Sequence, residues 1–269
     1  MNNCRNLKEA KGMIKVVVSG AGGKMGQAVT DLINTSDDIK VIGGFDLFAK
    51  GSENLKIYDD LYKIPEVPDV IIDFSNPSAI KNLTKYAVEK NAALVIGTTG
   101  LTDEHKEMLH NAAKSVPVFV SHNMCLGIAL LSNITRQMTE VLTDHDIEII
   151  EKHHNQKIDA PSGTALMIAD SVKEVRKDAF YVYNRADVRK KRDKNEIGIH
   201  SIRGGNLVGE HTVLFIGEDE TISISHNLTS RKVLASGALK AIRFTAAQKP
   251  GYYSMDDLVQ SSFCPQKGQ

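Results

Sequence analysis

Between Met13 and Val120 the chain alternates short apolar runs with segments of helical periodicity, and this alternation constrains its fold most. The apolar runs that predict buried strands span residues 14–18, 39–45, 70–74, 92–96 and 116–120. The segments that repeat apolar side chains every three and four residues, as helices do, span residues 25–33, 78–90 and 102–114. Strands that alternate with helices form a parallel sheet covered on both faces. We therefore predict an α/β domain with a doubly wound parallel sheet.

The pattern changes after about Leu126. A long helical segment reaches Leu142, a strand covers residues 147–150, and another helix runs to about Lys177. The basic passage from Arg185 to Lys194 has no apolar period and is predicted to be a solvated loop. Three strand-like segments follow with short turns, at 198–203, 207–215 and 221–226, and a helix over about 230–247. Because strands joined by short turns pair antiparallel, we predict a second α+β domain with a mixed or antiparallel sheet.

Charge and cysteine content narrow the class of partner. Thirty-three basic residues balance thirty-three acidic ones, so no net field attracts nucleic acid or a membrane surface, and a small molecule is the expected partner. Three scattered cysteines, Cys4, Cys125 and Cys264, argue against a disulfide framework and fit the cytoplasm. No apolar run approaches the roughly 18 residues of a membrane span. Residues 1–12 precede the pattern, carry no export signal and are predicted to be a disordered extension.

A glycine-rich turn follows the first predicted strand, in the string V-V-V-S-G-A-G-G-K-M-G. Gly20, Gly23 and Gly26 are spaced G-x-x-G-x-x-G, and Gly22 also keeps the turn open to a pyrophosphate. Asp46 ends the second strand, where an acidic side chain can bind a ribose 2′-hydroxyl. The alternative is a purely structural turn. The strand before it and the helix after it favour Rossmann-like dinucleotide binding.

Asp46 also bears on the choice of cofactor. Its charge would repel a 2′-phosphate, which favours NADH over NADPH, although Lys24 and Lys50 could soften that preference and leave dual use open. Two more turns end strands of the same predicted sheet, at 97–100 and 121–124. Each could contact the nicotinamide end of a cofactor, and each could equally be a plain loop.

The stretch E-K-H-H-N-Q-K-I-D-A-P-S-G-T, residues 151–164, concentrates the chain's reactive side chains. His153 and Lys157 are candidate proton donors, because imidazole titrates near neutrality and a lysine in a desolvated or basic site does so as well. Ser162, Gly163 and Thr164 open a predicted helix, whose N-terminal N–H groups suit a carboxylate or phosphate. The competing interpretation is a capped helix after an ordinary loop. No cysteine or carboxylate stands at zinc-ligand spacing, so no metal is expected.

Together the strings G-A-G-G-K-M-G, D-F-S, G-T-T-G, E-K-H-H-N-Q-K-I-D-A-P-S-G-T and V-G-E-H-T closely resemble the dihydrodipicolinate reductase family, over residues 13 to about 259. The resemblance implies reduction of a cyclic dicarboxylate, 4-hydroxy-tetrahydrodipicolinate, by NADH or NADPH with loss of water in lysine biosynthesis. It also implies a homotetramer assembled through the second domain's sheet. Residues 199–215 are apolar enough to form such an interface. Many relatives carry a basic residue where this chain has Leu47, so Leu47 joins Asp46 in favouring NADH.

The resemblance also implies roles for particular residues. His153 matches the proton donor and acceptor, Lys157 a second proton donor, and His154 a substrate contact, while Gly163 and Thr164, next to Ser162, match the seat of a substrate carboxylate. The glycine turn and the resemblance together give these cofactor positions: Gly20, Ala21, Gly22, Gly23, Lys24, Met25, Gly26, Asp46, Gly97, Thr98, Thr99, Ser121, His122, Asn123 and Met124.

Residues 13–126 with 241–269 are accordingly predicted to bind the dinucleotide, and residues 127–240 to bind substrate and form the oligomer. Hinges are expected near Leu126 and Ala241, because the two sets of residues must meet for hydride transfer. Two other functions stay open at this point. One is a dehydrogenase acting on aspartate or another small amino or keto acid, and the other is a non-catalytic NAD(H) sensor whose basic run 185–194 contacts a partner.

Overall fold

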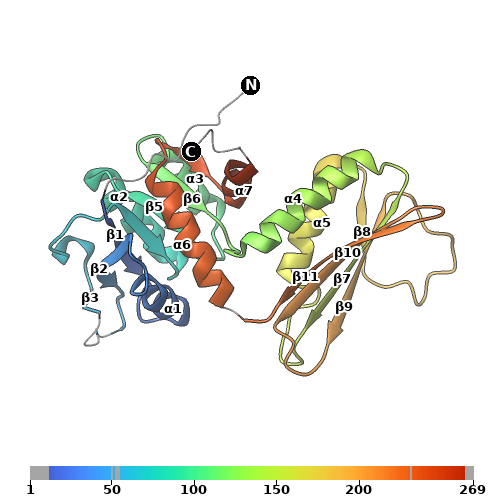
Figure 1. Cartoon of the computed structure of the whole chain (residues 1–269), viewed down its shortest axis with the longest axis horizontal. Helices are drawn as coiled ribbons and strands as arrows, with labels where there is room; N and C mark the ends of the chain where they lie inside the picture. The colour runs from blue at the N-terminus through green and yellow to red at the C-terminus, as the bar shows by residue number, and fades with distance from the viewer. Residues whose placement is uncertain (1–11, 50, 52–54, 231, 264–269) are drawn as a thin grey trace. The chain divides into compact units, whose positions relative to one another are not determined.

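The computed structural model describes residues 12–49, 51, 55–230 and 232–263. The predicted extension, apart from Gly12, and Lys50 lie outside these residues. The chain forms two compact units, residues 1–125 with 232–269 and residues 126–231 (Figure 1). The sequence predicts that the chain returns from the second unit to the first at residues 240–241. In the structure it returns earlier, before α6 (Lys232–Ala246). Ala241 lies fully buried inside this continuous helix, so a hinge at that position is wrong.

The first unit contains a sheet of seven strands, all of whose pairs are parallel. Its order is β12-β6-β5-β4-β1-β2-β3. Because the chain winds outward in both directions from β1, the sheet is doubly wound as predicted, with its switch point between β1 and β4. The strands are β1 (Ile14–Ser19), β2 (Ile39–Phe45), β3 (Ile57–Tyr58), β4 (Val70–Asp73), β5 (Ala93–Ile96), β6 (Pro117–Val120) and β12 (Gly251–Tyr253).

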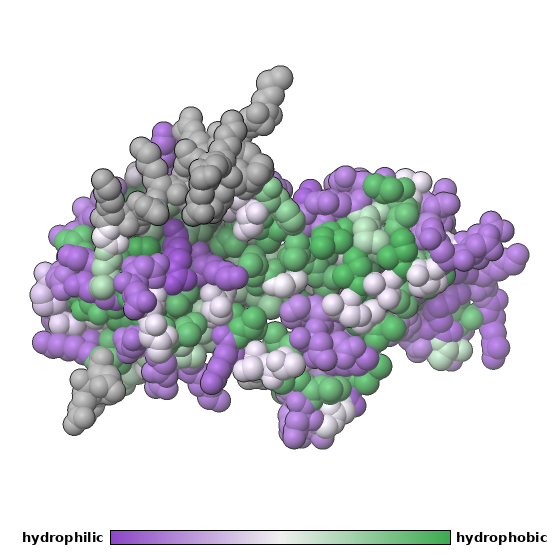
Figure 2. All heavy atoms as spheres, in the orientation of Figure 1, coloured by the Kyte–Doolittle hydropathy of each residue, from purple (hydrophilic) through white to green (hydrophobic). Residues whose placement is uncertain are grey.

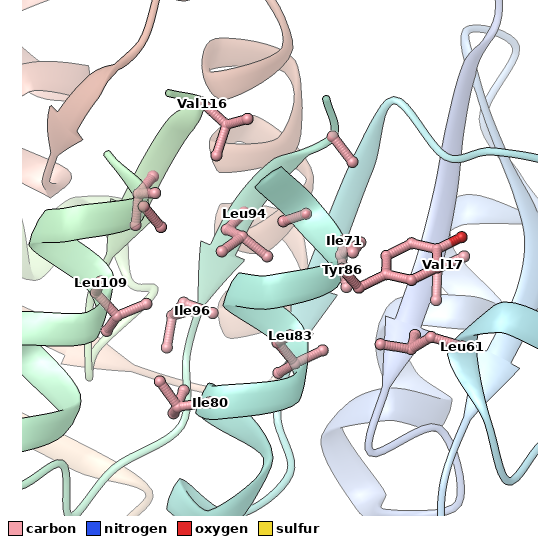
Figure 3. Packing of buried hydrophobic residues seen from close by; sticks show 14 of the residues in the cluster. Val17, Leu61, Ile71, Ile80, Leu83, Tyr86, Leu94, Ile96, Leu109 and Val116 are labelled. Carbon is pink, nitrogen blue, oxygen red and sulfur yellow. The ribbon is translucent and has the colours of Figure 1, made fainter. Parts of the chain in front are cut away.

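Helices cover this sheet. They are α1 (Lys24–Ile33), α2 (Ile80–Lys90), α3 (Asp103–Ala112), α6 and α7 (Met255–Phe263), with short 3-10 turns at Leu61–Lys63 and Pro77–Ala79. Helix α2 packs beside α3, and α1 beside α6. Apolar side chains of β1, β4 and β5, such as Val17, Ile71 and Leu94, pack against Leu83 and Tyr86 of α2 (Figure 3). Burial of these side chains is the main force that holds the strand ends in place.

The second unit has a five-stranded sheet in the order β11-β10-β7-β9-β8, with α4 (Leu126–Val141) and α5 (Gly163–Val175) packed together and against it. The strands are β7 (Asp146–His153), β8 (Phe180–Val182), β9 (Glu196–Arg203), β10 (Gly209–Ile216) and β11 (Thr221–Leu228). Parallel pairs join β7, β8 and β9, and antiparallel pairs join β7, β10 and β11, so the predicted mixed sheet is confirmed. On α4, Val141 is exposed and other hydrophobic side chains, such as Ile134 and Met138, are half-buried. Figure 2 shows hydrophobic surface in this region.

One expected strand pairing is wrong. The short turn after residue 203 predicted that β9 and β10 pair with each other, but β7 lies between them. The end of β7 is fastened to that turn from both sides, because Gly204 N–H donates to His153 O and Asn155 N–H donates to Gly205 O. This insertion makes β7 the central strand and places His153 at its end.

Candidate active site

The glycine turn lies directly after β1, as predicted. Gly20 has a φ of 75°, and a Cβ there would lie 2.6 Å from Phe74 O. A Cβ on Gly26 would overlap Gly20 O, so the first turn of α1 packs against the loop only with glycine. Gly23 caps α1 with no side-chain bond, which leaves the N–H groups of this helix end available to an anion. Of the neighbouring predicted residues, Ala21 is buried, Gly22 and Met25 are half-buried, and Lys24 is exposed.

Asp46 lies beside this turn. Its Oδ2 accepts the Gly22 N–H at 3.1 Å, and its Oδ1 accepts the N–H groups of Phe48 and Ala49 at 2.9 and 3.1 Å. The carboxylate therefore ties the end of β2 to the glycine turn. The next side chain, Leu47, is exposed and supplies no positive charge.

The other two predicted cofactor turns end β5 and β6. Gly97 follows β5 and packs against the Phe74 ring, Thr98 is buried, and Thr99 is exposed. After β6, the Ser121 hydroxyl donates to Asn123 O at 2.8 Å, and His122 is exposed. Met124 is buried and belongs to the core, and its backbone carbonyl lies against Gly237 of α6. Since β1, β4, β5 and β6 are parallel neighbours, their carboxyl ends share one edge of the sheet.

Asp73, at the end of β4, is a residue of this edge that the sequence analysis missed. It is fully buried and accepts hydrogen bonds from Ser19 Oγ at 2.6 Å, Ser75 Oγ at 2.5 Å and Thr98 Oγ1 at 2.6 Å. Burial raises the pKa of this carboxyl above its ordinary value, and the hydrogen bonds from the three hydroxyls offset that rise only in part. Asp73 thus ties together the ends of β1, β4 and β5. The D-F-S string already contains Asp73 and Ser75, but only the pairing of the strands shows that three hydroxyls converge on this carboxylate.

In the second unit, the alternation along β7 decides which reactive side chains are buried. Glu151 and His153 are two residues apart and lie on the face that packs toward the helices, where both are buried. His154 follows the strand and is half-buried. His153 Nδ1 lies 2.5 Å from Glu151 Oε2. The surface-histidine interpretation is therefore wrong for His153.

The loop after β7 carries the remaining predicted residues. Lys157 is half-buried, and its Nζ lies 2.8 Å from Asp159 Oδ1. Ser162 is the N-cap of α5 and accepts the Ala165 N–H at 3.1 Å. Gly163 is exposed, with nothing within 4 Å of the position of a Cβ, and Thr164 is half-buried. The N-terminus of α5 is thus open around Gly163, as a carboxylate seat requires.

Three further groups surround His153, and the sequence analysis gave none of them a role: Glu151 and His211 are buried, and Arg203 is half-buried. Arg203 Nη2 donates to Glu151 Oε1 at 2.6 Å, and Arg203 Nη1 donates to Oε2 at 2.8 Å. The Ser162 N–H also donates to Glu151 Oε1, at 3.1 Å. The His211 ring meets the His153 ring edge to face at 5.3 Å, and His211 Nε2 lies 3.0 Å from Ser162 Oγ.

Their charges follow from these contacts. Burial opposes ionisation of Glu151, but hydrogen bonds from Arg203, Ser201 and His153 outweigh it and lower the pKa to about 2. Burial, with a smaller contribution from His153, lowers the pKa of His211 to about 4. At neutral pH the site therefore holds an ionised Glu151, a charged Arg203 and a neutral His211.

Within the described residues, no group of three His, Cys, Asp or Glu side chains is placed to hold a metal ion. In the same part of the chain, no helix is long and apolar enough to cross a membrane.

A doubly wound sheet with a glycine turn and an acidic residue after β2, joined to a unit with buried histidines and an open helix terminus, defines a nicotinamide-dependent oxidoreductase. Two family models match nearly the whole chain. Residues 14–124 match "Dihydrodipicolinate reductase, N-terminus" and residues 127–259 match "Dihydrodipicolinate reductase, C-terminus". The chain belongs to the dihydrodipicolinate reductase family.

Individual relatives agree with this assignment. A 4-hydroxy-tetrahydrodipicolinate reductase of Caldanaerobacter subterraneus subsp. tengcongensis is 47% identical, with 92% of this chain and 99% of the relative covered. One from Clostridium novyi is 43% identical, with 93% and 99% covered. Among solved structures, a dipicolinate-bound dihydrodipicolinate reductase from Paenisporosarcina sp. TG-14 has a TM-score of 0.79 and 27% identity, over 91% of this chain and 99% of that one. The chain is thus an NAD(P)H-dependent oxidoreductase of lysine and diaminopimelate biosynthesis, not a nucleotide sensor.

Proposed function

We propose that this chain reduces 4-hydroxy-tetrahydrodipicolinate to tetrahydrodipicolinate with His153 and Lys157 as its proton-transferring residues. The observation that carries the proposal is the loop after β7. It begins at a buried histidine held by Glu151, contains Lys157, and ends at the open N-terminus of α5. Proton transfer and carboxylate binding are the two tasks that this substrate demands.

The C4 hydroxyl leaves as water together with a hydrogen lost from the ring, and the ring takes up one hydride and one proton, so the net reaction consumes one reduced nicotinamide and one proton. The reduced nicotinamide supplies the hydride. His153 and Lys157 are the groups of this loop that can deliver the proton, by general acid catalysis, a step that typically contributes about 10²–10⁴-fold. Gly163 and Thr164, with Ser162 as the cap, are proposed to hold one substrate carboxylate through N–H groups of α5, and His154 to contact the substrate.

The first unit is proposed to bind the cofactor. The glycine turn would take the pyrophosphate, Asp46 the adenine-side ribose, and the turns at 97–99 and 121–124 the nicotinamide end. We propose a preference for NADH, because Asp46 places a negative charge beside the 2′ position and Leu47 offers no cation to a 2′-phosphate.

We further propose a cytoplasmic homotetramer assembled through the second sheet. Ile199 and Phe215 contribute to the apolar character of residues 199–215. Both are buried on the face of the sheet that packs against α4 and α5. The opposite face still carries Ile150 and Leu214, which alternate with the buried positions of β7 and β10, and Ile202, which pairs with Lys152 and so lies on the same face. The apolar side chains left partly exposed on this otherwise polar face support self-association.

The function is tested by following loss of reduced-nicotinamide absorbance while a coupling synthase generates the cyclic substrate. The wild type should turn over, and His153→Ala and Lys157→Ala should each lower kcat by about 10²-fold or more with nucleotide affinity nearly unchanged. A wild type that is inactive on this substrate but active on aspartate or another small amino acid would refute the proposal. Unaltered turnover in both variants would refute the two proton-transfer roles.

A further inference from the structure

The buried carboxylate of Glu151 has no role in the proposed chemistry so far, yet it contacts the proposed proton donor directly. Its side chain is fully buried, and its Oε2 lies 2.5 Å from His153 Nδ1. Both side chains leave the same face of β7, because residues two apart along a strand point the same way. The strand itself therefore aims the carboxylate at the imidazole.

The carboxylate is also fixed from its other side. Arg203 donates to both oxygens, at 2.6 and 2.8 Å, and the Ser162 N–H adds a third bond at 3.1 Å. A bidentate guanidinium and a backbone N–H keep the carboxylate ionised and in one orientation. An ionised carboxylate only accepts hydrogen bonds, so the proton between Glu151 and His153 belongs to Nδ1.

We infer that Glu151 is a positioning residue: it holds neutral His153 as the tautomer protonated on Nδ1, so that Nε2 is the nitrogen that exchanges a proton with the substrate. This inference rests on the proposed function and deepens it. Gly209 leaves space on the Nε2 side, since a Cβ there would approach Nε2 to 3.1 Å. In the same arrangement Arg203 is the group that orients Glu151.

Charged and titratable groups surround His153 from every element packed against it. Glu151 comes from β7, Arg203 from β9 and His211 from β10. From the loop after β7, Lys157 is paired with Asp159. His226 of β11 is half-buried, and its charge would help to lower the pKa of His211. Glu151 is the only negative charge in contact with the His153 ring among the described residues, so it is the group that favours the imidazolium.

This charge arrangement predicts opposite effects for two substitutions. Glu151→Gln keeps the shape but removes the negative charge, so the imidazolium loses its partner and deprotonates at lower pH. Arg203→Met removes a positive charge behind the carboxylate, so the imidazolium becomes more favourable. If protonated His153 is the proton donor, the alkaline limb of the kcat–pH profile moves to lower pH in the first variant and to higher pH in the second. A merely structural role would not give opposite signs.

The test measures kcat and KM against pH in the full-length protein for both variants. Glu196→Gln is the matched control. Glu196 is the first residue of β9; its carboxylate is also buried, is paired with Arg185 and is remote from His153 and His211. We expect Glu151→Gln to lower kcat about 10- to 100-fold, the range typical for loss of a group that orients an imidazole ligand. KM for the nucleotide should stay near the wild-type value, and Glu196→Gln should leave the pH profile in place.

A second readout does not depend on activity or on Arg203→Met folding. In ¹⁵N NMR spectra of the wild type, neutral His153, assigned by its loss in His153→Gln, should carry its proton on Nδ1. A neutral Nε2-protonated tautomer would overturn the inference, as would a Glu151→Gln variant with wild-type kcat and pH profile. The inference is equally overturned if Glu196→Gln shifts the profile as Glu151→Gln does. A wild type without activity on the cyclic substrate would instead reject the proposed function.

Discussion

In the proposed function, a single carboxylate sets how the first unit contacts the adenine-side ribose of its cofactor. Asp46 is held by three backbone N–H groups, and Leu47 beside it is exposed. The double variant Asp46→Asn/Leu47→Arg keeps one oxygen that can accept the N–H groups of Phe48 and Ala49, removes the repelling charge and adds a guanidinium. A charge-assisted hydrogen bond is worth about 1.5–3 kcal/mol, so the ratio of NADPH to NADH affinity should rise by roughly 10- to 100-fold.

Calorimetric titration with each nucleotide measures that ratio. Leu47→Gln is the control, because it adds polarity at the same exposed position without charge and should leave the ratio near that of the wild type. An unmodified chain that already binds NADPH far more tightly than NADH would contradict the role of Asp46.

Site residues that lie close together in the sequence could be predicted from their spacing. Site residues that only strand pairing brings together could not. Gly20 and Asp46 directly follow strands, and Gly26 comes at characteristic spacing in the first turn of α1. Arg203, in contrast, reaches Glu151 only because β9 pairs in parallel with β7, fifty-two residues away in sequence. No local pattern marks that pairing.

The elements themselves show the same division. Apart from α7, the strands and helices of five residues or more were predicted within a few residues of their ends, because their apolar periods are long enough to recognise. Strands β3, β8 and β12 have two or three residues, too few for any period, and the sequence pattern after residue 247 did not predict α7. The basic passage is irregular as predicted, but Arg192 within it is not solvated. Its guanidinium donates to Asp146, Glu148 and Ile147 O, which fastens the loop to β7.

At the level of the sheet, the proposed tetramer makes a prediction about one face. Leu214→Glu places a charge among Ile150 and Ile202 on the face away from α4 and α5, so every copy would bring a like charge into the interface. Sedimentation should then show dimers or monomers in place of tetramers. Val141→Glu, on the exposed apolar side of α4, is the control and should leave the mass unchanged. The reverse result would place the interface on α4.

For the whole molecule, the buried groups around His153 predict how stability depends on pH. The pKa of His211 is lowered from 6.5 to about 4, so as pH falls the unfolded chain takes up a proton before the folded chain does. Its contribution is complete above pH 6.5 and is lost between 6.5 and about 4. The pKa of Glu151 is lowered from 4.5 to about 2, so its contribution is lost between those values. At 1.36 kcal/mol per pKa unit, each loss amounts to about 3 kcal/mol.

The second unit should therefore lose stability in two successive acid steps. Urea unfolding followed by circular dichroism at a series of pH values measures them as the slope of the unfolding free energy. His211→Gln cannot titrate, so it should flatten most of the slope between pH 6.5 and 4, leaving the smaller part due to His226, whose pKa burial also lowers. The same variant should keep the loss below pH 4.5, because Glu151 and Arg203 are untouched. A slope between pH 6.5 and 4 that is equal in His211→Gln and the wild type would show that His211 is not the neutral buried base that its contacts imply.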